Sequence, residues 1–331
     1  MTSARPALQT PLRTQLERIA GDAGRAPSKH NTQPWRFAVS ATALEVWPDP
    51  ARVLPETDPH RRELLLACGA AVQTALLLAH GEGLSTRVDV LPEGTAGPVA
   101  RIGVLGEQQV HGHDEALAGA VLGRRTDRGP LDATMLPRGT AFRLQQAAAD
   151  HGVELRLVTA AGEQDAVARL LLEADHRLAT RPSAADEVRA WSRSAPSGRS
   201  DGVDAAATRG AAASYGARFV QRDFSLPGSV PLHDGTGPDL PLLGVLTTPA
   251  DHPQDWVAAG RALVQLLLEL TLAGGAASFL NQVVEDPASR TRLQDVLGST
   301  AWPQLVLRIG VGGDVPPSAR RCAHETVVQV G

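Results

Sequence analysis

The sequence predicts a mixed helix-and-strand protein assembled from two related halves. The chain has 331 residues, which is more than one small core needs. Apolar residues recur with helical periodicity in some segments and alternate with polar residues in others. An Ala-Pro-Ser loop follows a predicted helix at residues 26–28 and again at residues 195–197. This recurrence indicates a duplicated unit.

The elements can be taken in chain order. A helix over residues 12–20 ends at two glycines, and the loop 25–34 follows it. Alternating residues then predict a hairpin over 35–47, and an apolar run predicts a long helix over 62–80. The other predicted elements are strands over 86–91, 99–105, 153–158, 242–247 and 304–311, and helices over 114–122, 137–151, 164–178, 186–192, 256–272 and 287–297. Residues 198–237 lack periodic apolar positions, so we expect an excursion over the surface or a lid.

Composition excludes several classes of protein. Hydrophobic residues make up 43% of the chain, charged residues 21%, and the net charge is -4, so neither disorder nor a nucleic-acid partner is expected. Cys68 and Cys322 are far apart and the ten histidines show no metal-ligand spacing, which favours a reduced, cytoplasmic chain without a metal site. Residues 1–10 contain no apolar run and the longest apolar stretches are interrupted by Gln or Glu, so we expect neither export nor a membrane span.

The loop APSKHNTQPWRF, residues 26–37, concentrates unusual residues. Pro27 and Pro34 stiffen it, and Ser28, Asn31 and Gln33 supply fixed hydrogen-bonding groups. It also carries Lys29, the single lysine of the chain. One interpretation is a surface turn entering a strand. The other is a site for the polar edge of a flat heterocycle, which needs amide and hydroxyl groups on a rigid backbone.

A second cluster, GRRTDR, spans residues 123–128. Arg124, Arg125, Thr126 and Arg128 would form a phosphate clamp, since guanidinium groups bind phosphate in a bidentate manner. A solvated cationic turn is the alternative.

Two further segments are candidates for a site. Gly274 and Gly275 end a long apolar helix, either as a helix C-cap or as a place where backbone amides approach a planar ring. PQLVLRIG, residues 303–310, predicts a buried strand, and the basic pair Arg320 and Arg321 follows it. The motifs of hydrolases, nucleotide-binding loops and zinc enzymes are absent from the sequence.

Taken in order, these clusters resemble the FMN-dependent nitroreductase superfamily, and most closely its Acg-like family of NAD(P)H nitroreductases. That family carries an APSxHNTQPWRF loop, a D..RRE and CGAA helix, an RRTxR motif, an AGRAL helix running to a glycine turn, and a PQ..LR.G strand. The matching segments here are residues 26–37, 58–63 with 67–71, 124–128, 259–263 with Gly274, and 303–310. Five motifs in one order cover nearly the whole chain.

The resemblance implies an α+β fold with a mainly antiparallel sheet sandwiched between helices. Ordinary nitroreductases bind FMN between the subunits of a homodimer. Here the similarity implies that residues 1–113 and 114–331 are two fused nitroreductase-like halves, forming a pseudo-dimer within one chain. The second Ala-Pro-Ser loop lacks the Asn and Gln-Pro-Trp of the first, so we expect one FMN per chain, covered by residues 198–237. The protein would be a monomeric pseudo-dimer or a homodimer.

The resemblance also assigns roles to residues. Arg124, Arg125, Thr126 and Arg128, with Arg320 or Arg321, would hold the FMN phosphate. Pro27, Ser28, Lys29, Asn31 and Gln33 would meet the flavin from the first half, with Lys29 as the charge near N1 and O2. Gly274 and Gly275 would offer a backbone donor near N5. No side chain is expected to act as nucleophile or base, because the flavin carries the hydride.

Three functions follow from the resemblance. The main one is an FMN-binding oxidoreductase that uses NAD(P)H to reduce a small electrophile such as a nitroaromatic or a quinone. The second is an FMN-sequestering or storage protein with a lidded flavin and little turnover. The third is a flavin-dependent oxidase or dehydrogenase of secondary metabolism. One fold hosts several activities, so the sequence leaves these open.

Overall fold

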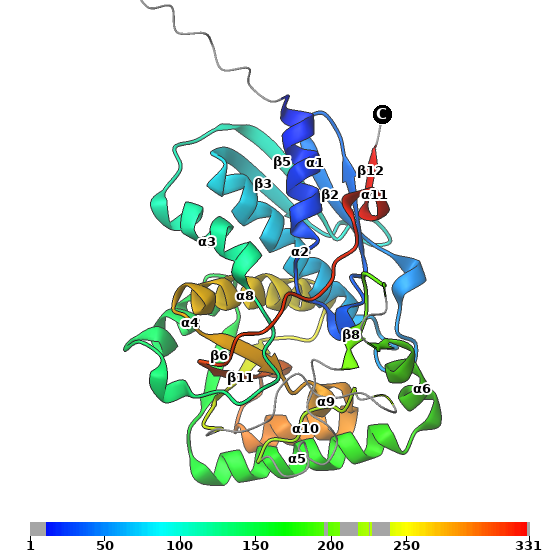
Figure 1. Ribbon diagram of the computed structural model, residues 1–331, viewed down its shortest axis with the longest axis vertical. Helices are drawn as coiled ribbons and strands as arrows, with labels where there is room; N and C mark the ends of the chain where they lie inside the picture. Colours follow the sequence, from blue (N-terminus) through cyan, green and yellow to red (C-terminus); the bar gives the residue numbers. More distant parts are fainter. Residues whose placement is uncertain (1–10, 195–197, 206–217, 225, 227–238, 330–331) are drawn as a thin grey trace, which may run out of the picture.

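The computed structural model describes residues 11–194, 198–205, 218–224, 226 and 239–329. Strands in this part of the chain form two main sheets, with long helices between them (Figure 1). All strand pairs within these sheets are antiparallel except one at an edge of the first. The predicted α+β class with mainly antiparallel pairing is therefore confirmed, although the strands are divided over two sheets.

The first sheet has the order β12-β1-β2-β5-β3. Four of its strands come from the first third of the chain, namely β1 (Trp35–Val39), β2 (Ala43–Pro48), β3 (Leu84–Val90) and β5 (Ala100–Glu107). Trp35, Phe37 and Val39 alternate along β1 and are fully buried, as the period of a strand requires. β4 (Pro92–Thr95) is a short exposed strand outside this sheet.

The second sheet has the order β10-β11-β9-β6. It contains β6 (Glu154–Val158), β9 (Leu242–Thr248), β10 (Ala276–Phe279) and β11 (Trp302–Gly310). β10 was not predicted, because only four residues follow the glycine turn before the next helix. β7 (Ser192–Arg193) and β8 (Val203–Asp204) pair separately.

Two helices link the sheets, and they approach each other closely. α2 (Arg62–Gly81) packs below the first sheet and against α8 (Pro253–Leu272), which lies on the second. A Cβ on Gly69 would lie 2.3 Å from the Val257 carbonyl oxygen, and one on Gly260 would lie 1.9 Å from that of Leu66. Only glycine allows this contact between backbones.

The other helices cover the outer faces and the ends of the sheets. α1 (Leu12–Ala23) and α3 (Gly112–Gly123) pack on α2, and α4 (Thr140–Ala149) packs on α8. α5 (Ala161–Ala179), α9 (Gln282–Glu285) and α10 (Pro287–Val296) share a core with the second sheet. α6 (Pro182–Ala190) begins four residues earlier than predicted, because Pro182 occupies its first turn.

The C-terminal segment returns to the first sheet. After β11 the chain runs along the molecule to α11 (Ala323–Thr326) and β12 (Val327–Gln329), which pairs in parallel with β1 (Figure 1). The sequence pattern predicted only a basic tail here. The long excursion carries residues 318–321 past the end of α1 and the loop after it.

One helix, α2, is long and apolar enough to span a membrane by composition, but 83% of the relevant window is buried in the protein. Its hydrophobic residues belong to the core between α1, the first sheet and α8.

Candidate functional site

The loop between α1 and β1 has an unusual backbone. His30, Asn31 and Gln33 have φ angles of 50°, 54° and 50°, in the left-handed region that residues with a Cβ seldom occupy. Such conformations cost on the order of 1–3 kcal/mol each and persist only where the surroundings hold them. Within the loop, the Gln33 backbone amide donates to Ser28 Oγ at 2.9 Å.

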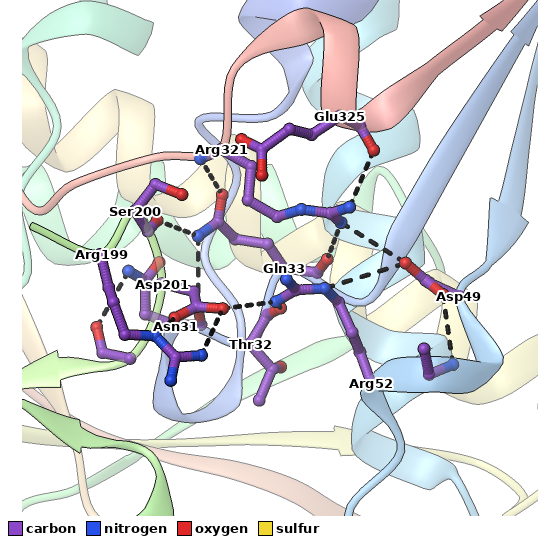
Figure 2. A network of polar contacts seen from close by, with 12 residues as sticks. Asn31, Thr32, Gln33, Asp49, Arg52, Arg199, Ser200, Asp201, Arg321 and Glu325 are labelled. Atoms are coloured by element: carbon purple, nitrogen blue, oxygen red, sulfur yellow. Dashed lines mark hydrogen bonds and ion pairs between the residues drawn. The ribbon is translucent and has the colours of Figure 1, made fainter.

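Side chains of this loop bind two distant segments of the chain (Figure 2). Gln33 Nε2 donates to the Ser200 carbonyl at 2.7 Å, and Gln33 Oε1 accepts from the Arg321 amide at 2.8 Å. Asn31 Nδ2 donates to the carbonyls of Gly202 at 3.0 Å and Ala319 at 3.1 Å. These contacts explain how the strained loop is held between residues 200–202 and the C-terminal segment.

Arginines around the loop are paired with two aspartates (Figure 2). Arg52 Nη1 lies 3.1 Å from Asp201 Oδ2, and Arg321 Nη1 lies 3.5 Å from Asp49 Oδ2. Burial would raise the pKa of Asp201, but hydrogen bonds from its arginine neighbours, including Arg52, lower it below its ordinary value. The protein thus supplies counter-charges for these arginines.

A hollow with about 900 Å³ of free space, part of it open to solvent, lies beside the loop. Both halves of the chain line it. The lining residues are Pro27, Ser28, Lys29, His30, Asn31, Glu63, Leu66, Ala67, Arg124, Thr126, Arg128, Arg222, Phe224, Leu263, Phe279, Asn281, Gln282, Glu285, Leu305, Ser318 and Arg320.

One wall of the hollow holds an ion cluster made of Lys29, Glu63, Arg222 and Glu285. Lys29 Nζ lies 2.5 Å from Glu63 Oε2 and 3.1 Å from Glu285 Oε2, and Arg222 Nη2 lies 2.5 Å from Glu285 Oε2. The four side chains are 12% or less exposed. Burial would raise the pKa of Glu285, but the charges of Arg222 and Lys29 outweigh it and hold the pKa near 2. The two cations and two carboxylates of the cluster balance each other, and Arg62 Nη2 lies at its edge, 3.8 Å from Glu63 Oε1.

A smaller pocket of about 300 Å³, here called the arginine pocket, adjoins the hollow. It shares Arg124, Thr126, Ser318 and Arg320 with the hollow. Its other lining residues are Arg25, Val121, Arg125 and Pro317.

Charge in the arginine pocket is unbalanced. Within the described part of the chain, none of Arg124, Arg125 and Arg320 forms an ion pair with a carboxylate. Arg124 and Arg320 both donate to the Arg25 carbonyl, at 3.3 and 3.4 Å. Burial and the charge of Arg125 lower the pKa of Arg124 to about 10; burial and three neighbouring arginines lower that of Arg320 to about 9.

Two buried donors in this pocket lack a partner. Arg124 Nη1 and Arg320 Nε have no hydrogen-bond acceptor among the described residues. A buried cation without counter-charge is costly, and a phosphate group would supply both the charge and the acceptors. The donor set of the arginine pocket therefore fits the phosphate of a bound cofactor.

The loop that carries Arg124–Arg128 is positioned from two sides. Asp127, fully buried, accepts from the amides of Gly129 at 2.7 Å and Gly313 at 3.0 Å. Arg308, on β11, donates to the Gly129 carbonyl at 3.4 Å and pairs with Asp239. These contacts hold the loop against the C-terminal segment and the second sheet.

The structure brings most of the predicted site residues together. Pro27, Ser28, Lys29, Asn31, Arg124, Thr126, Arg128 and Arg320 line the hollow, and Arg125 lines the arginine pocket. Gln33 and Arg321 lie outside both lining sets and belong to the network of Figure 2. Residues 195–197, the second Ala-Pro-Ser loop, lie outside the described residues.

Gly274 and Gly275 also lie outside both lining sets. Gly274 has φ of 76° and its amide donates to the Thr271 carbonyl, while the Gly275 amide donates to Leu270. The two amides thus complete the C-terminus of α8, which is the helix-cap interpretation of the pair.

Sequence reasoning missed several lining residues. Glu63 was visible only as part of a family motif, although a lone buried lysine needs an acidic partner. Gln282 and Glu285 lie in a short helix without periodicity, and Asn281 immediately precedes it. Arg222 and Phe224 lie in the predicted lid, and the composition of that segment does not indicate which residues it contacts. Of residues 198–237, the described parts are 198–205, 218–224 and 226.

Comparison with curated proteins identifies the family. No family model matches the chain. The chain is 33% identical over 320 residues to “Putative NAD(P)H nitroreductase Rv3131” of Mycobacterium tuberculosis, covering 92% of this chain and 88% of the relative. It is 28% identical over 321 residues to “Putative NAD(P)H nitroreductase acg” of the same organism, covering 92% of both chains.

Solved structures with a similar fold include two nitroreductases with bound FMN. That from Bacteroides fragilis is 14% identical with a TM-score of 0.38, covering 62% of this chain and 94% of that one. That from Desulfitobacterium hafniense is 12% identical with a TM-score of 0.42, covering 65% and 98%. From the sequence relatives, the chain belongs to the nitroreductase superfamily, close to its Acg-like members.

Proposed function

We propose that this protein is an FMN-dependent oxidoreductase that uses NAD(P)H to reduce a small electrophile, such as a nitroaromatic or a quinone. The observation that carries the proposal is the pair of buried donors on Arg124 and Arg320 that have no partner among the described residues, beside a hollow lined by residues of both motif loops. The sequence relatives, which are named NAD(P)H nitroreductases, agree with it.

In this proposal the arginine pocket holds the FMN phosphate. Arg124 and Arg320 would bind it with charge-assisted hydrogen bonds, and the Thr126 hydroxyl would add a neutral donor. The ring system would occupy the hollow, where Leu66, Leu263 and Leu305 supply apolar surface. Bound FMN supplies hydride chemistry, which explains why no nucleophile or general base is needed.

For the charge that faces the ring we propose Arg128 in place of Lys29. Lys29 is the residue that the family resemblance favours, but Glu63 and Glu285 already balance its charge. Arg128 lines the hollow and lies over the Phe224 ring, 5.6 Å from its centroid. Burial lowers the pKa of Arg128 to about 10, so it stays cationic at neutral pH. A cation at this position would favour electron transfer into the ring.

We further propose that residues 1–113 and 114–331 act as two fused halves around one FMN. The lining residues of the hollow come from positions between 27 and 67 in the first half and from scattered positions between 124 and 320 in the second. Both sides of the site thus come from one chain, so an FMN site would not require a second subunit. The C-terminal strand β12, which joins the first sheet, would tie the halves together.

Flavin storage is a second candidate function, and the described part of the predicted lid favours it. Arg222 pairs with Glu285, and Gln282 Nε2 donates to the Val220 carbonyl at 2.7 Å. Arg222 and Phe224 both line the hollow. A segment fixed in this way would cover the ring and slow the entry of substrates.

An absorption spectrum of the freshly purified protein tests the proposal, with identification of the released flavin and anaerobic addition of NADPH or NADH. Bound FMN that bleaches with either nucleotide and is reoxidised by a quinone supports the oxidoreductase. Bound FMN that resists both nucleotides and chemical acceptors supports storage. Absence of flavin after reconstitution with FMN would contradict both functions.

A further inference from the structure

The arginine pocket carries more positive charge than one phosphate monoester neutralises. Four arginines line it, namely Arg25, Arg124, Arg125 and Arg320. A phosphate monoester carries about -1.5 to -2 charges at pH 7. Among the described residues, the carboxylate that pairs with this set is Asp22, whose Oδ1 lies 4.0 Å from Arg25 Nε. Four arginine charges, less Asp22 and the phosphate, therefore leave about 1 to 1.5 positive charges after FMN binds.

The four arginines lie at two depths. Arg124 is 8% exposed, and Arg320, although partly exposed as a residue, has its Nε atom buried. The Arg25 side chain is 42% exposed, and Arg125 is partly exposed. Arg125 donates through Nη1 to the carbonyls of Leu122 at 2.6 Å and Arg124 at 2.9 Å. A first anion would occupy the inner pair, and the outer pair would remain on the rim.

The rim has the chemistry of a second phosphate site. Arg25 follows the end of α1 and Arg125 lies in the turn after α3, so the two side chains reach the pocket from separate elements. Guanidinium groups bind phosphate monoesters well because their donors match the phosphate oxygens. The substrate that brings such a group to a flavin site is the phosphorylated form of the nicotinamide donor, which carries an additional monoester on the adenosine ribose.

We propose that Arg25 and Arg125 select NADPH over NADH by binding the adenosine 2′-phosphate. This inference rests on the proposed FMN site, because the inner arginines must already be neutralised by the FMN phosphate. The rim is exposed, so the preference is electrostatic and falls as salt screens the charges.

The test uses the full-length protein loaded with one equivalent of FMN, established by its absorption spectrum. Calorimetry compares adenosine 2′,5′-bisphosphate with adenosine 5′-monophosphate. We expect the bisphosphate to bind about ten to a hundred times more tightly, because the monophosphate lacks the 2′-phosphate and cannot form its charged hydrogen bonds. In the double variant Arg25→Ala/Arg125→Ala the difference should shrink to about threefold or less, while Arg87→Ala, an exposed arginine on β3, keeps it.

Steady-state kinetics give a second measurement. The ratio of kcat/KM for NADPH to that for NADH should exceed about ten at low salt, and the double variant should lower it mainly through KM for NADPH. If the protein binds FMN but has equal affinity for the two adenosine nucleotides, the inference is overturned and the proposed function stays intact. Failure to bind FMN would overturn both.

Discussion

The ion cluster and the arginine pocket border the same hollow but differ in charge balance. In the ion cluster, Lys29 and Arg222 face Glu63 and Glu285 within 3.1 Å. In the arginine pocket, Arg124 and Arg320 share a backbone carbonyl and leave buried donors without partners. Cations that the chain neutralises itself stabilise the fold; cations that it leaves unmatched indicate where an anionic ligand binds.

The largest effect is expected when the ion cluster loses one of its carboxylates. Glu285→Gln leaves Lys29 and Arg222 with one carboxylate fewer in a buried site, so the free energy of unfolding should fall by about 3–5 kcal/mol. Urea denaturation at pH 7 measures it. Glu163→Gln, which disturbs a partly exposed pair with Arg156, should cost less than about 1 kcal/mol. Equal losses in the two variants would contradict the role of the ion cluster.

The second prediction concerns the unbalanced region. Arg124→Ala should weaken FMN binding by about 1.5–3 kcal/mol for each charged hydrogen bond lost. Without FMN, its free energy of unfolding should change by less than about 1 kcal/mol, because removing an unmatched buried charge offsets the lost packing. Fluorescence titration and urea denaturation provide the two values. A variant that binds FMN normally but unfolds easily would show that Arg124 stabilises the fold and does not bind the cofactor.

The third prediction concerns the strained loop that lies between the two regions. Gln33→Ala removes the acceptor for the Arg321 amide and the donor to Ser200, so the free energy of unfolding should fall by about 1–3 kcal/mol. The flavin spectrum should shift as well, since Pro27–Asn31 line the hollow. Loss of stability with an unaltered spectrum would show that the loop does not position the ring.

The smallest expected effect, counted per pH unit, is a pH dependence next to the ion cluster. Burial and the charge of Glu63 raise the pKa of Asp58 to about 7. A raised carboxyl pKa stabilises the folded state below the unfolded value of about 4, and this contribution is lost as the pH rises through about 7. The free energy of unfolding should therefore depend less on pH in Asp58→Asn over this range, by less than about 1.4 kcal/mol per pH unit. An unchanged slope would contradict the raised pKa.

The sequence predicted much of the fold and the part of the site that local motifs encode. Strong periodicity placed α2, α8 and the first hairpin within a few residues. The loop 26–37 and the cluster 124–128 were both identified as site candidates, and the structure places residues of both around one hollow. Each motif carries its chemistry in consecutive residues, so no knowledge of the tertiary structure is needed to find it.

The rest depends on contacts between distant residues. Glu285 and Arg222 are 63 positions apart, and nothing in either segment indicates their pairing. Gln33 looked like a cofactor ligand because an amide suits a heterocycle, but its partners are Ser200 and Arg321. β12 was missed because three residues show no pattern, and its place in the first sheet follows from the path of the C-terminal segment.

The most direct test compares FMN with riboflavin, which differs from it by lacking the phosphate. Calorimetry on the wild-type protein and on Arg124→Ala isolates the contribution of the arginine pocket. We predict that the wild type binds FMN at least about a hundredfold more tightly than riboflavin, and that Arg124→Ala loses most of this difference by weakening FMN alone. Equal affinity of the wild type for both flavins, or an undiminished preference in Arg124→Ala, would contradict the assignment of the unmatched arginines to a cofactor phosphate.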